Sequence, residues 1–474
     1  MMSVAGKRPA TGPLVVSKEN PRYFMDSSTG RYVYLTGSHT WNNFQDIGFD
    51  NDGDGIPEYI REKSRGIPGV FDYRGYLDFL VRNNHNFIRL WVWEHARGSP
   101  WRSTEPLSFY PLPYRRTGPG LARDGLPKFN LDEFEPYYFQ RLAERVEMAY
   151  KRGIYVAVML FSGASIGNRG WPEGGWNSWE THPFHRDNNI NGVDGDLDGD
   201  GQGWDIRDPR NEVVLTRQKA YLRKVVDTLN ELDNVLYEIS NEDPFDSYAW
   251  QYEIINYLKE YQSALPKQHP VGMSTAWNMP EDNSRLYESP ADWIAPDEYH
   301  GDYRHDPIVW DGNTTRLSGP KVMIADTDHV FPGPTTIDFT WKAFCRGQNV
   351  ISMDHEDGAA ALQFNGFQTT AADRAQGQVR RYAERMSLAT AVPCGEISST
   401  RYCLASPGRE YLVFQPMEGL FSVDLTGAPG EFSCEWFDPS RDRLFKAPHI
   451  PGGGVRLFEN PYPGPAVLYL KRVI

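Results

Sequence analysis

Two apolar segments of this chain stop on acidic residues. The segment NVLYEIS, residues 234–240, is followed directly by Asn241 and Glu242, and the segment KVMIAD, residues 321–326, ends on Asp326, with Asp328 two residues further on. A carboxyl group can donate a proton, accept one or attack an electrophilic carbon, and two facing carboxyls can divide these tasks. We therefore expect a two-carboxylate site that pairs Glu242 with Asp326 or Asp328.

Both segments also allow a structural interpretation. Ser240, Asn241 or Asp243 could cap a following helix. Asp326 and Asp328 could cap a loop or bind a metal ion. The chemical interpretation requires the two segments to be strands whose carboxyl ends meet on one face.

The elements between and around these segments predict such an arrangement. Short apolar runs recur with helical patterns between them, and most are continuous, which indicates parallel strands buried on both faces. Eight of them predict an α/β fold, a (β/α)8 TIM barrel with long insertions. The expected strands are 31–37, 86–93, 154–161, 234–240, 270–275, 292–299, 321–326 and 349–354. The expected helices are 73–84, 135–153, 213–232, 249–265, 336–347 and 373–390.

Two further regions flank the barrel. After residue 392 short alternating runs and Gly/Pro turns predict a C-terminal antiparallel β-sandwich domain, residues 393–474. Residues 1–30 are expected to form an N-terminal hairpin or apron over the bottom of the barrel, and residues 31–392 the barrel itself.

In such a barrel, the residues that follow each strand surround one site. Two facing carboxyls are what glycosidic cleavage needs, and flat aromatic side chains stack on sugar rings. The chain holds 14 Trp and 26 Tyr, which core packing alone could also explain. We predict a carbohydrate substrate, contacted by residues at the strand ends and in the aromatic loop 167–185: Arg89, Trp91, Trp93, Glu94, His95, Asn241, Tyr299, His300, His329, Trp171 and Trp176.

The motif YEISNE followed by a carboxylate late in the barrel resembles the clan of retaining glycoside hydrolases typified by cellulases and β-mannanases. The stretches RYVYLTGSHTWNNF and FIRLW, with the tail EWFDPSRDRLF and VLYLKR, resemble a cellulase-like subgroup. That subgroup carries a C-terminal collagen-binding-type sandwich and includes apiosidase-like proteins.

The resemblance implies a role for each matching residue. Glu242 would be the acid/base and Asp326 the nucleophile, a position where the clan normally has Glu. Tyr299 would bond the nucleophile, Asn241 a sugar hydroxyl, and Arg89 would lower the pKa of the nucleophile. Because Asp is one methylene shorter than Glu, the carboxyl separation, and with it the choice between retention and inversion, stays open. His300 and His329 could tune the carboxylates or be structural.

Two acidic loops carry the D-x-D-x-D-G pattern of calcium-binding loops. The first contains Asp50, Asp52 and Asp54, and the second gives the pattern twice in overlapping frames. The frame that starts at Asp194 continues with Asp196 and Asp198 and reaches Asp205 at position 12, and Asp200 belongs to the overlapping frame. We expect structural Ca2+ in both loops, and solvated acidic turns are the alternative.

Bulk composition narrows the partners. The net charge of −14 without a basic stripe argues against nucleic acid and against an anionic membrane. No apolar run is long enough to span a membrane, and the start lacks a signal-peptide core, so the protein is cytoplasmic or was secreted or periplasmic with its signal removed. The four cysteines show no metal spacing, and free buried thiols are expected, with a Cys394–Cys403 bridge as the alternative.

Two other functions fit the same features. One is a carbohydrate-binding barrel that has lost its chemistry, which the Asp at the seventh strand would favour. The other is a calcium-dependent polysaccharide lyase, which would need a Lys, Arg or Tyr base beside the metal.

Overall fold

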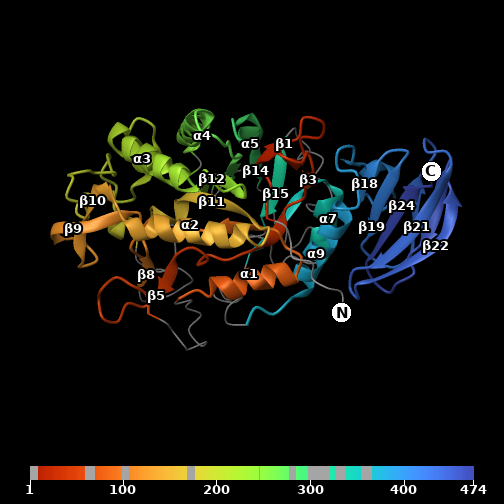
Figure 1. The fold of residues 1–474 in the computed structure, drawn as a ribbon, viewed down its shortest axis with the longest axis horizontal. Coiled ribbons are helices and arrows are strands. Elements are labelled where there is room, and N and C mark those ends of the chain that lie inside the picture. The colour runs from red at the N-terminus through yellow and green to blue at the C-terminus, as the bar shows by residue number, and fades with distance from the viewer. Residues whose placement is uncertain are drawn as a thin grey trace.

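The fold divides into a barrel and a smaller β domain that lie side by side along the longest axis (Figure 1). The computed structural model describes residues 9–58, 70–98, 106–167, 177–244, 246–276, 284–296, 321–326, 337–353 and 366–473. Within these residues no helix has the length and apolar composition that crossing a bilayer requires.

The barrel is one parallel eight-stranded sheet, in the order β4-β16-β15-β14-β13-β12-β11-β6. Each of the eight predicted strand regions contributes a strand to the barrel, and the (β/α)8 prediction is confirmed. The strands are β4 (Thr36–His39), β6 (Phe87–Leu90), β11 (Tyr155–Ser162), β12 (Val235–Asn241), β13 (Val271–Ser274), β14 (Trp293–Ala295), β15 (Val322–Asp326) and β16 (Asn349–Met353).

Asn86 closes the barrel between β4 and β6, the two strands at the ends of the sheet order. Its backbone N–H donates to Thr36 O at 2.9 Å, and its side-chain Oδ1 accepts from Thr36 N at 3.0 Å. One residue therefore satisfies both backbone groups of Thr36 at the seam, where β4 and β6 are not paired as a regular ladder.

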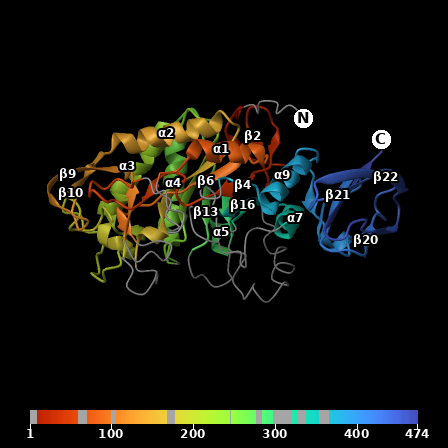
Figure 2. The same cartoon turned by 90° about the horizontal axis from the view of Figure 1, so that it is seen from below.

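Helices cover the outside of the sheet, as Figure 2 shows from a second side. Each predicted helix forms, and α9 ends seven residues earlier than the expected 373–390. The helices are α1 (Tyr73–Arg82), α2 (Pro136–Tyr150), α3 (Glu212–Leu229), α4 (Tyr248–Ser263), α5 (Ser284–Glu288), α7 (Ile337–Cys345) and α9 (Ala371–Ala383).

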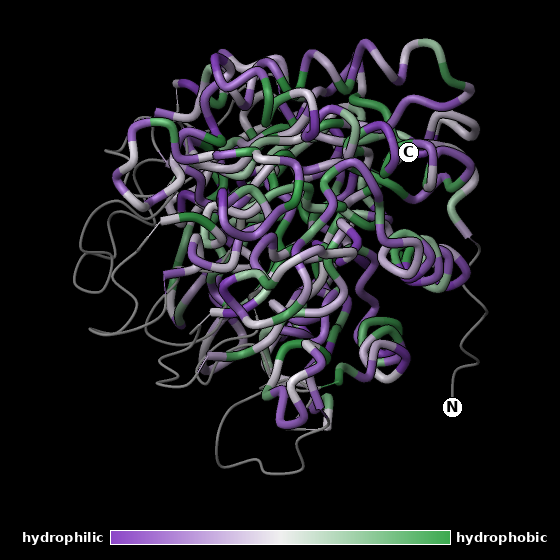
Figure 3. The backbone as a smooth tube through the Cα atoms, turned by 90° about the vertical axis from the view of Figure 1, so that its left-hand side faces the viewer, coloured by the Kyte–Doolittle hydropathy of each residue, from purple (hydrophilic) through white to green (hydrophobic). Residues whose placement is uncertain are grey.

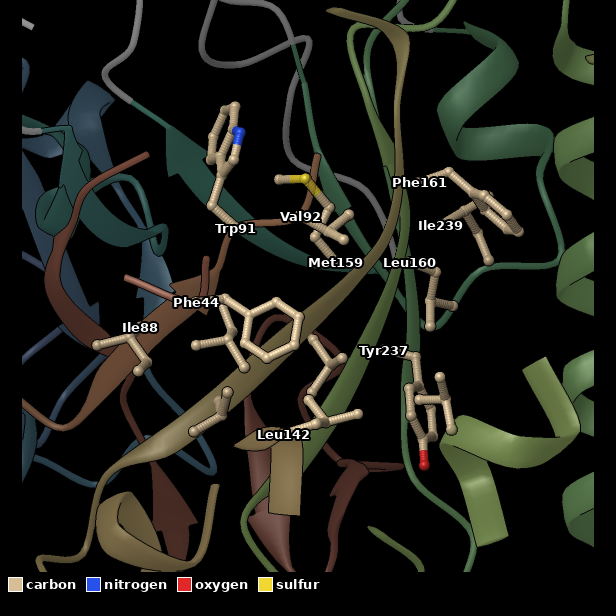
Figure 4. Close-up of a cluster of buried hydrophobic side chains, with 14 of the residues drawn as sticks. Phe44, Ile88, Trp91, Val92, Leu142, Met159, Leu160, Phe161, Tyr237 and Ile239 are labelled. Atoms are coloured by element: carbon tan, nitrogen blue, oxygen red, sulfur yellow. The ribbon is translucent and has the colours of Figure 1, made fainter. Parts of the chain in front are cut away.

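The continuous apolar runs supply two cores at once. Along β12, Leu236 belongs to the core inside the barrel, and its neighbours Val235 and Tyr237 belong to the core between sheet and helices. This alternation is the pleat of a strand buried on both faces. The apolar interior and polar exterior are visible in Figure 3, and part of the outer core is shown in Figure 4.

The inner core fills the bottom of the barrel and leaves the top for polar groups. Phe87, Leu236, Trp293 and Val322 form its floor. The Trp293 indole lies over Gly272, where an added Cβ would come within 1.8 Å of the ring, so this position needs glycine. Because the floor is packed, a site can open only at the carboxyl ends of the strands.

An N-terminal antiparallel sheet packs under this floor. It contains β1 (Leu14–Val16), β2 (Phe24–Asp26) and β3 (Tyr32–Val33), and Leu14 and Phe24 join the inner core. The predicted single strand 31–37 is wrong as one element. Tyr32–Val33 pairs with the hairpin, and the barrel strand begins only at Thr36.

Insertions above the barrel were not predicted as strands. They form a three-stranded sheet of β5 (Asp46–Gly48), β8 (Leu107–Tyr110) and β7 (Arg97–Gly98), and a hairpin of β9 (Tyr114–Leu121) and β10 (Pro127–Phe134). Pro and charged residues interrupt the alternation in these segments, so the strand signal is weak.

The C-terminal domain is the expected antiparallel β-sandwich. One sheet has the order β17-β18-β19-β24-β21-β22 and the other pairs β20 with β23. The strands are β17 (Val392–Pro393), β18 (Cys403–Ser406), β19 (Glu410–Gln415), β20 (Leu420–Asp424), β21 (Glu431–Asp438), β22 (Arg443–Pro451), β23 (Val455–Glu459) and β24 (Ala466–Arg472).

An apolar cluster joins this domain to the barrel. Trp341 of α7 and Tyr382 of α9 pack against Phe414 and Phe437 of the sandwich. The four cysteines, all in described segments, are buried free thiols, which confirms the expectation and excludes the Cys394–Cys403 bridge in this structure.

Candidate active site

Glu242 follows directly after β12, at the carboxyl end of the barrel. Its φ is +50°, in the left-handed region that a residue with a Cβ rarely adopts. Such a conformation costs about 1–3 kcal/mol and persists only where the surroundings fix it, and it is found most often at functional sites. The side chain is half-buried.

The residue before Glu242 is fixed by Arg89. Arg89 Nη2 donates to Asn241 Oδ1 at 2.9 Å, and Arg89 also grips Glu238 with two bonds, from Nε to Oε2 at 2.7 Å and from Nη2 to Oε1 at 2.5 Å. Arg89 is 1% and Glu238 0% exposed, so this is a buried ion pair inside the barrel, one layer below the mouth. Arg89 was predicted to act on the nucleophile. The partners described for it here are Glu238 and Asn241.

The residue after Glu242 is fixed by Arg207. Arg207 belongs to the short helix η4 (Trp204–Arg207), and its Nε bonds Asp243 Oδ1 at 2.9 Å. Its Nη2 bonds Glu94 Oε1, which also accepts from Ser162 N at 2.9 Å. One cation is therefore shared between two carboxylates, and Asp243 and Arg207 are 0% and 1% exposed.

The pKa values of Glu94 and Asp243, the two carboxylates bonded to Arg207, shift in opposite directions. Burial opposes ionisation of Glu94, but Arg207 and His182 outweigh it and lower the pKa of Glu94 from 4.5 to about 2. Burial dominates at Asp243 and raises its pKa despite Arg207.

Glu94 and His95 were predicted to contact substrate, and that contact stays a prediction. Both oxygens of Glu94 have partners inside the protein, Oε1 as above and Oε2 facing His182 Nε2 at 3.6 Å. His95 lies deeper. It is 1% exposed, packs against Trp93 and Phe109, and burial together with His182 lowers its pKa to about 3. Both residues support the mouth from within.

The segment that carries Trp91 and Trp93 continues past β6 without a strand partner. Side-chain amides replace that partner. Asn43 accepts from Trp91 N at 2.8 Å and donates to Arg89 O at 2.6 Å, and Gln45 accepts from Trp93 N at 2.6 Å and donates to Trp93 O at 3.0 Å. These bonds fix the two indoles although the ladder has ended.

The two tryptophans differ in role. Trp93 Nε1 donates to Trp41 O at 2.8 Å, so Trp93 holds Trp41 in place. Trp91 stacks near His39 and Trp41, and its Nε1 is buried without a hydrogen-bond partner among the described residues. Figure 4 shows Trp91 standing apart from the aliphatic cluster and pointing away from Leu142. Trp91 and Trp93 are 2% and 4% exposed and both belong to the outer core, and their predicted contact with substrate stays a prediction.

Part of the predicted site falls outside the described residues. This holds for Asp328, Tyr299, His300, His329, Trp171 and Trp176. Asp326 is the last residue of β15 and pairs in register with Ile351, and its side chain is outside the description.

The two acidic loops share one hydrogen-bond pattern. In the first, Gly55 N donates to Asp50 Oδ2 at 3.0 Å, and in the second, Gly201 N donates to Asp196 Oδ2 at 2.9 Å. Each glycine is therefore position 6 of a loop that begins at the bonded aspartate. In the second loop this bond follows the frame that starts at Asp196, and the frame that starts at Asp194 stays a prediction.

Carboxylate oxygens gather in both loops. Within each of two sets they lie within 4.8 Å of one another: Asp50, Asp52 and Asp54, and Asp196, Asp198 and Asp205. Asp194 lies outside the second set, with an ion pair to Arg186 at 3.4 Å. Asp196 Oδ1 is buried and has no hydrogen-bond partner among the described residues, and a role as a cation ligand would explain this. Oxygen ligands at this spacing suit Ca2+.

Sequence reasoning missed the residues that hold the site together. These are Glu238, Arg207, Asp243, Asn43, Gln45 and His182. Glu238 had a signal, since a carboxylate in the middle of an apolar strand needs a buried cation, and Arg89 sits at the same depth of another strand.

Comparisons with known proteins place the fold. A family model described as "Domain of unknown function (DUF6298)" matches residues 94–282. No curated protein matches the chain. A solved structure described as "Glycoside hydrolase" is 13% identical with a TM-score of 0.61, and the match covers 98% of each chain. A glycoside hydrolase family 5 structure from Bacteroides vulgatus is 12% identical with a TM-score of 0.58, covering 98% of this chain and 95% of that one. At such identities the likeness establishes a shared fold over nearly the whole length.

Proposed function

We propose that this chain is a glycoside hydrolase in which Glu242 is the general acid and base. The observation that carries the proposal is the state of Glu242 itself. It stands at the carboxyl end of β12 in a (β/α)8 barrel, in a left-handed conformation, between Asn241 and Asp243, which are both anchored by buried arginines. The full-length likeness to glycoside hydrolase folds supports it.

The second carboxylate is proposed to be Asp326, with Asp328 as the alternative. Asp326 ends β15 two residues after Ile324, which belongs with Val322 to the core inside the barrel. Because successive strand residues alternate between the two faces, position 326 lies on the same face of the strand as positions 322 and 324. Tyr299, His300 and His329 are proposed to surround this carboxylate.

The proposed reaction is retaining. Glu242 protonates the glycosidic oxygen while the second carboxylate attacks the anomeric carbon and the leaving group departs. Glu242, now ionised, then takes a proton from a water molecule, and the water oxygen attacks the anomeric carbon. The bond between that carbon and the carboxylate breaks, which releases the sugar and the free carboxylate. Asn241 and Trp91 donate hydrogen bonds to sugar hydroxyls, and Arg89 orients Asn241. Trp171 and Trp176 contact more distant sugar units. Inversion follows instead if the shorter Asp leaves room for a water between the carboxyls.

The substrate is proposed to be a plant or microbial polysaccharide or oligosaccharide. We place the chain in the apiosidase-like subgroup with a collagen-binding-type sandwich, on the resemblance of its N-terminal, FIRLW and C-terminal motifs. A secreted or periplasmic location accords with such a substrate.

We also propose structural Ca2+ in the two acidic loops. The support is the shared position-6 bond, the two carboxylate sets, and the unpartnered Asp196 Oδ1. Loops of this kind in extracellular modules bind calcium with a Kd of about 10⁻⁴–10⁻³ M, which agrees with that location.

The experiment that tests the function is a panel of polysaccharides and aryl glycosides with product analysis. Hydrolysis gives a new reducing end and no ultraviolet-absorbing double bond, and the anomer formed first, read by NMR, separates retention from inversion. An unsaturated product would identify a polysaccharide lyase. Binding of a sugar without turnover across the panel would identify a carbohydrate-binding barrel.

A further inference from the structure

Arg207 connects three consecutive strand ends at the mouth of the barrel. Its Nε bonds Asp243 after β12 at 2.9 Å, its Nη2 bonds Glu94 after β6, and Nη2 lies 3.5 Å from Ser162 O at the end of β11. Ser162 also pairs in register with Asn241. No other described residue forms ion pairs with both Glu94 and Asp243.

The guanidinium is held rigidly in this position. It is 1% exposed, and its Cζ lies 4.7 Å from the ring centre of Trp250 and 5.1 Å from that of Phe161. A planar fork that bonds two carboxylates while it packs against two aromatic rings is a geometry that a lysine ammonium cannot reproduce.

The anchored Asp243 bears directly on Glu242. A residue other than glycine keeps a left-handed conformation where the surrounding structure over-determines it, and anchors on both of its neighbours do this. Arg89 fixes Asn241 on one side, and Arg207 fixes Asp243 on the other. Glu242 lies between these two anchors and has its φ of +50° there.

We infer that Arg207 is a positioning residue for the reaction. Through Asp243 it sets the direction in which Glu242 presents its carboxyl to the leaving oxygen. The inference rests on the proposed role of Glu242 as general acid. A displacement of about 1 Å in a catalytic group can cost about 10²-fold in rate, so loosening this anchor is expected to impair proton donation without removing the acid.

The leaving group provides the test. Phenyl and 2,4-dinitrophenyl glycosides of the sugar identified in the panel are compared, because dinitrophenolate departs without a proton and phenolate needs one. In Asp243→Asn and Arg207→Lys, kcat/KM for the phenyl glycoside should fall by about 10²-fold. For the dinitrophenyl glycoside it should change by less than about threefold, because no proton transfer is involved. Loss of an equal factor on both substrates would overturn the inference, as would no loss on either.

A double-mutant cycle adds an independent readout. If Asp243 acts only through Glu242, Asp243→Asn should cause no further loss in the Glu242→Gln background. Multiplicative losses would show an independent role and overturn the inference.

Arg141→Lys is the matched control. Arg141 on the outer helix α2 forms another partly buried ion pair, with Asp46 of β5 at 2.7 Å. It has no bond to Glu94 or Asp243 among the described contacts. This variant should lower the melting temperature and leave the ratio of the two activities unchanged. A shift of that ratio equal to the shift in Arg207→Lys would show a general stability effect and overturn the inference.

Failure of the proposed function looks different. If Glu242→Gln cleaves both glycosides as the wild type does, Glu242 is not the acid, and the proposed function fails together with the inference. If Glu242→Gln shows the leaving-group dependence but Asp243→Asn and Arg207→Lys do not, only the positioning role is lost.

Discussion

Arg89 Nη2 donates a 2.9 Å hydrogen bond to Asn241 Oδ1, and this bond links the second strand of the barrel to the fourth, one residue before Glu242. The Arg207–Asp243 ion pair lies on the other side of Glu242, so two buried cations hold the backbone conformation around this residue. The site is therefore held from strands and loops that are far apart in sequence, and its predictions follow from that.

Glu242→Gln should lower kcat on an unactivated glycoside by about 10²–10⁴-fold, the usual cost of losing a general acid. The melting temperature should change little, because the side chain is only half-buried and the amide has the same shape. Steady-state kinetics and a thermal melt measure both. Turnover at the wild-type rate would remove Glu242 from the mechanism.

Asp326→Asn and Asp328→Asn should differ from each other. The variant that loses the nucleophile should be inactive, and azide should restore turnover with formation of a glycosyl azide if the mechanism is retaining. The other variant should change mainly KM or stability, and we expect it to be Asp328→Asn. Near-normal kcat in both would exclude a two-carboxylate mechanism on these strands.

Removing calcium should destabilise the protein. Chelator should lower the melting temperature, and calcium at about 100 times its Kd should restore about 2.7 kcal/mol of unfolding free energy by mass action. Asp196→Asn and Asp198→Asn should reduce this response. Asp194→Asn is the control and should keep it, because Asp194 lies outside the carboxylate set. Identical melts with and without chelator, and no metal in elemental analysis, would refute the sites.

Lowering the pH should reduce the stability of the protein through protonation of His95. Its folded pKa is about 3 and its ordinary value 6.5, so the unfolded chain binds the proton first, and stability is lost as pH drops from about 6.5 towards 3. Between pH 7 and 4.5 this group alone contributes a loss of about 2.5 kcal/mol. His95→Gln should therefore show a shallower decline in denaturant melts across that range, with exposed His449→Gln as the control. Parallel slopes for wild type and His95→Gln would contradict the prediction.

The sequence by itself determined the barrel and the place of Glu242 at its mouth. The run 154–161 is apolar at every position because its strand contributes to two cores, and that pattern belongs to parallel sheets with helices on the outside. Once the strands are known, the carboxyl-end rule places Glu242 at the mouth, and the helices follow from their own periodicity.

Only the tertiary structure decided which polar residues near the strand ends have buried partners inside the protein. Glu94 and Glu242 both follow strands and look equivalent in sequence, but Arg207 reaches Glu94 from 113 residues away. Trp93 and Phe109 pack against His95 and bury it, and Gly201 donates a hydrogen bond to Asp196, five residues before it. Local patterns report propensity and burial, whereas a buried charge is assigned by the partner that the fold brings to it, and that partner leaves no local signal.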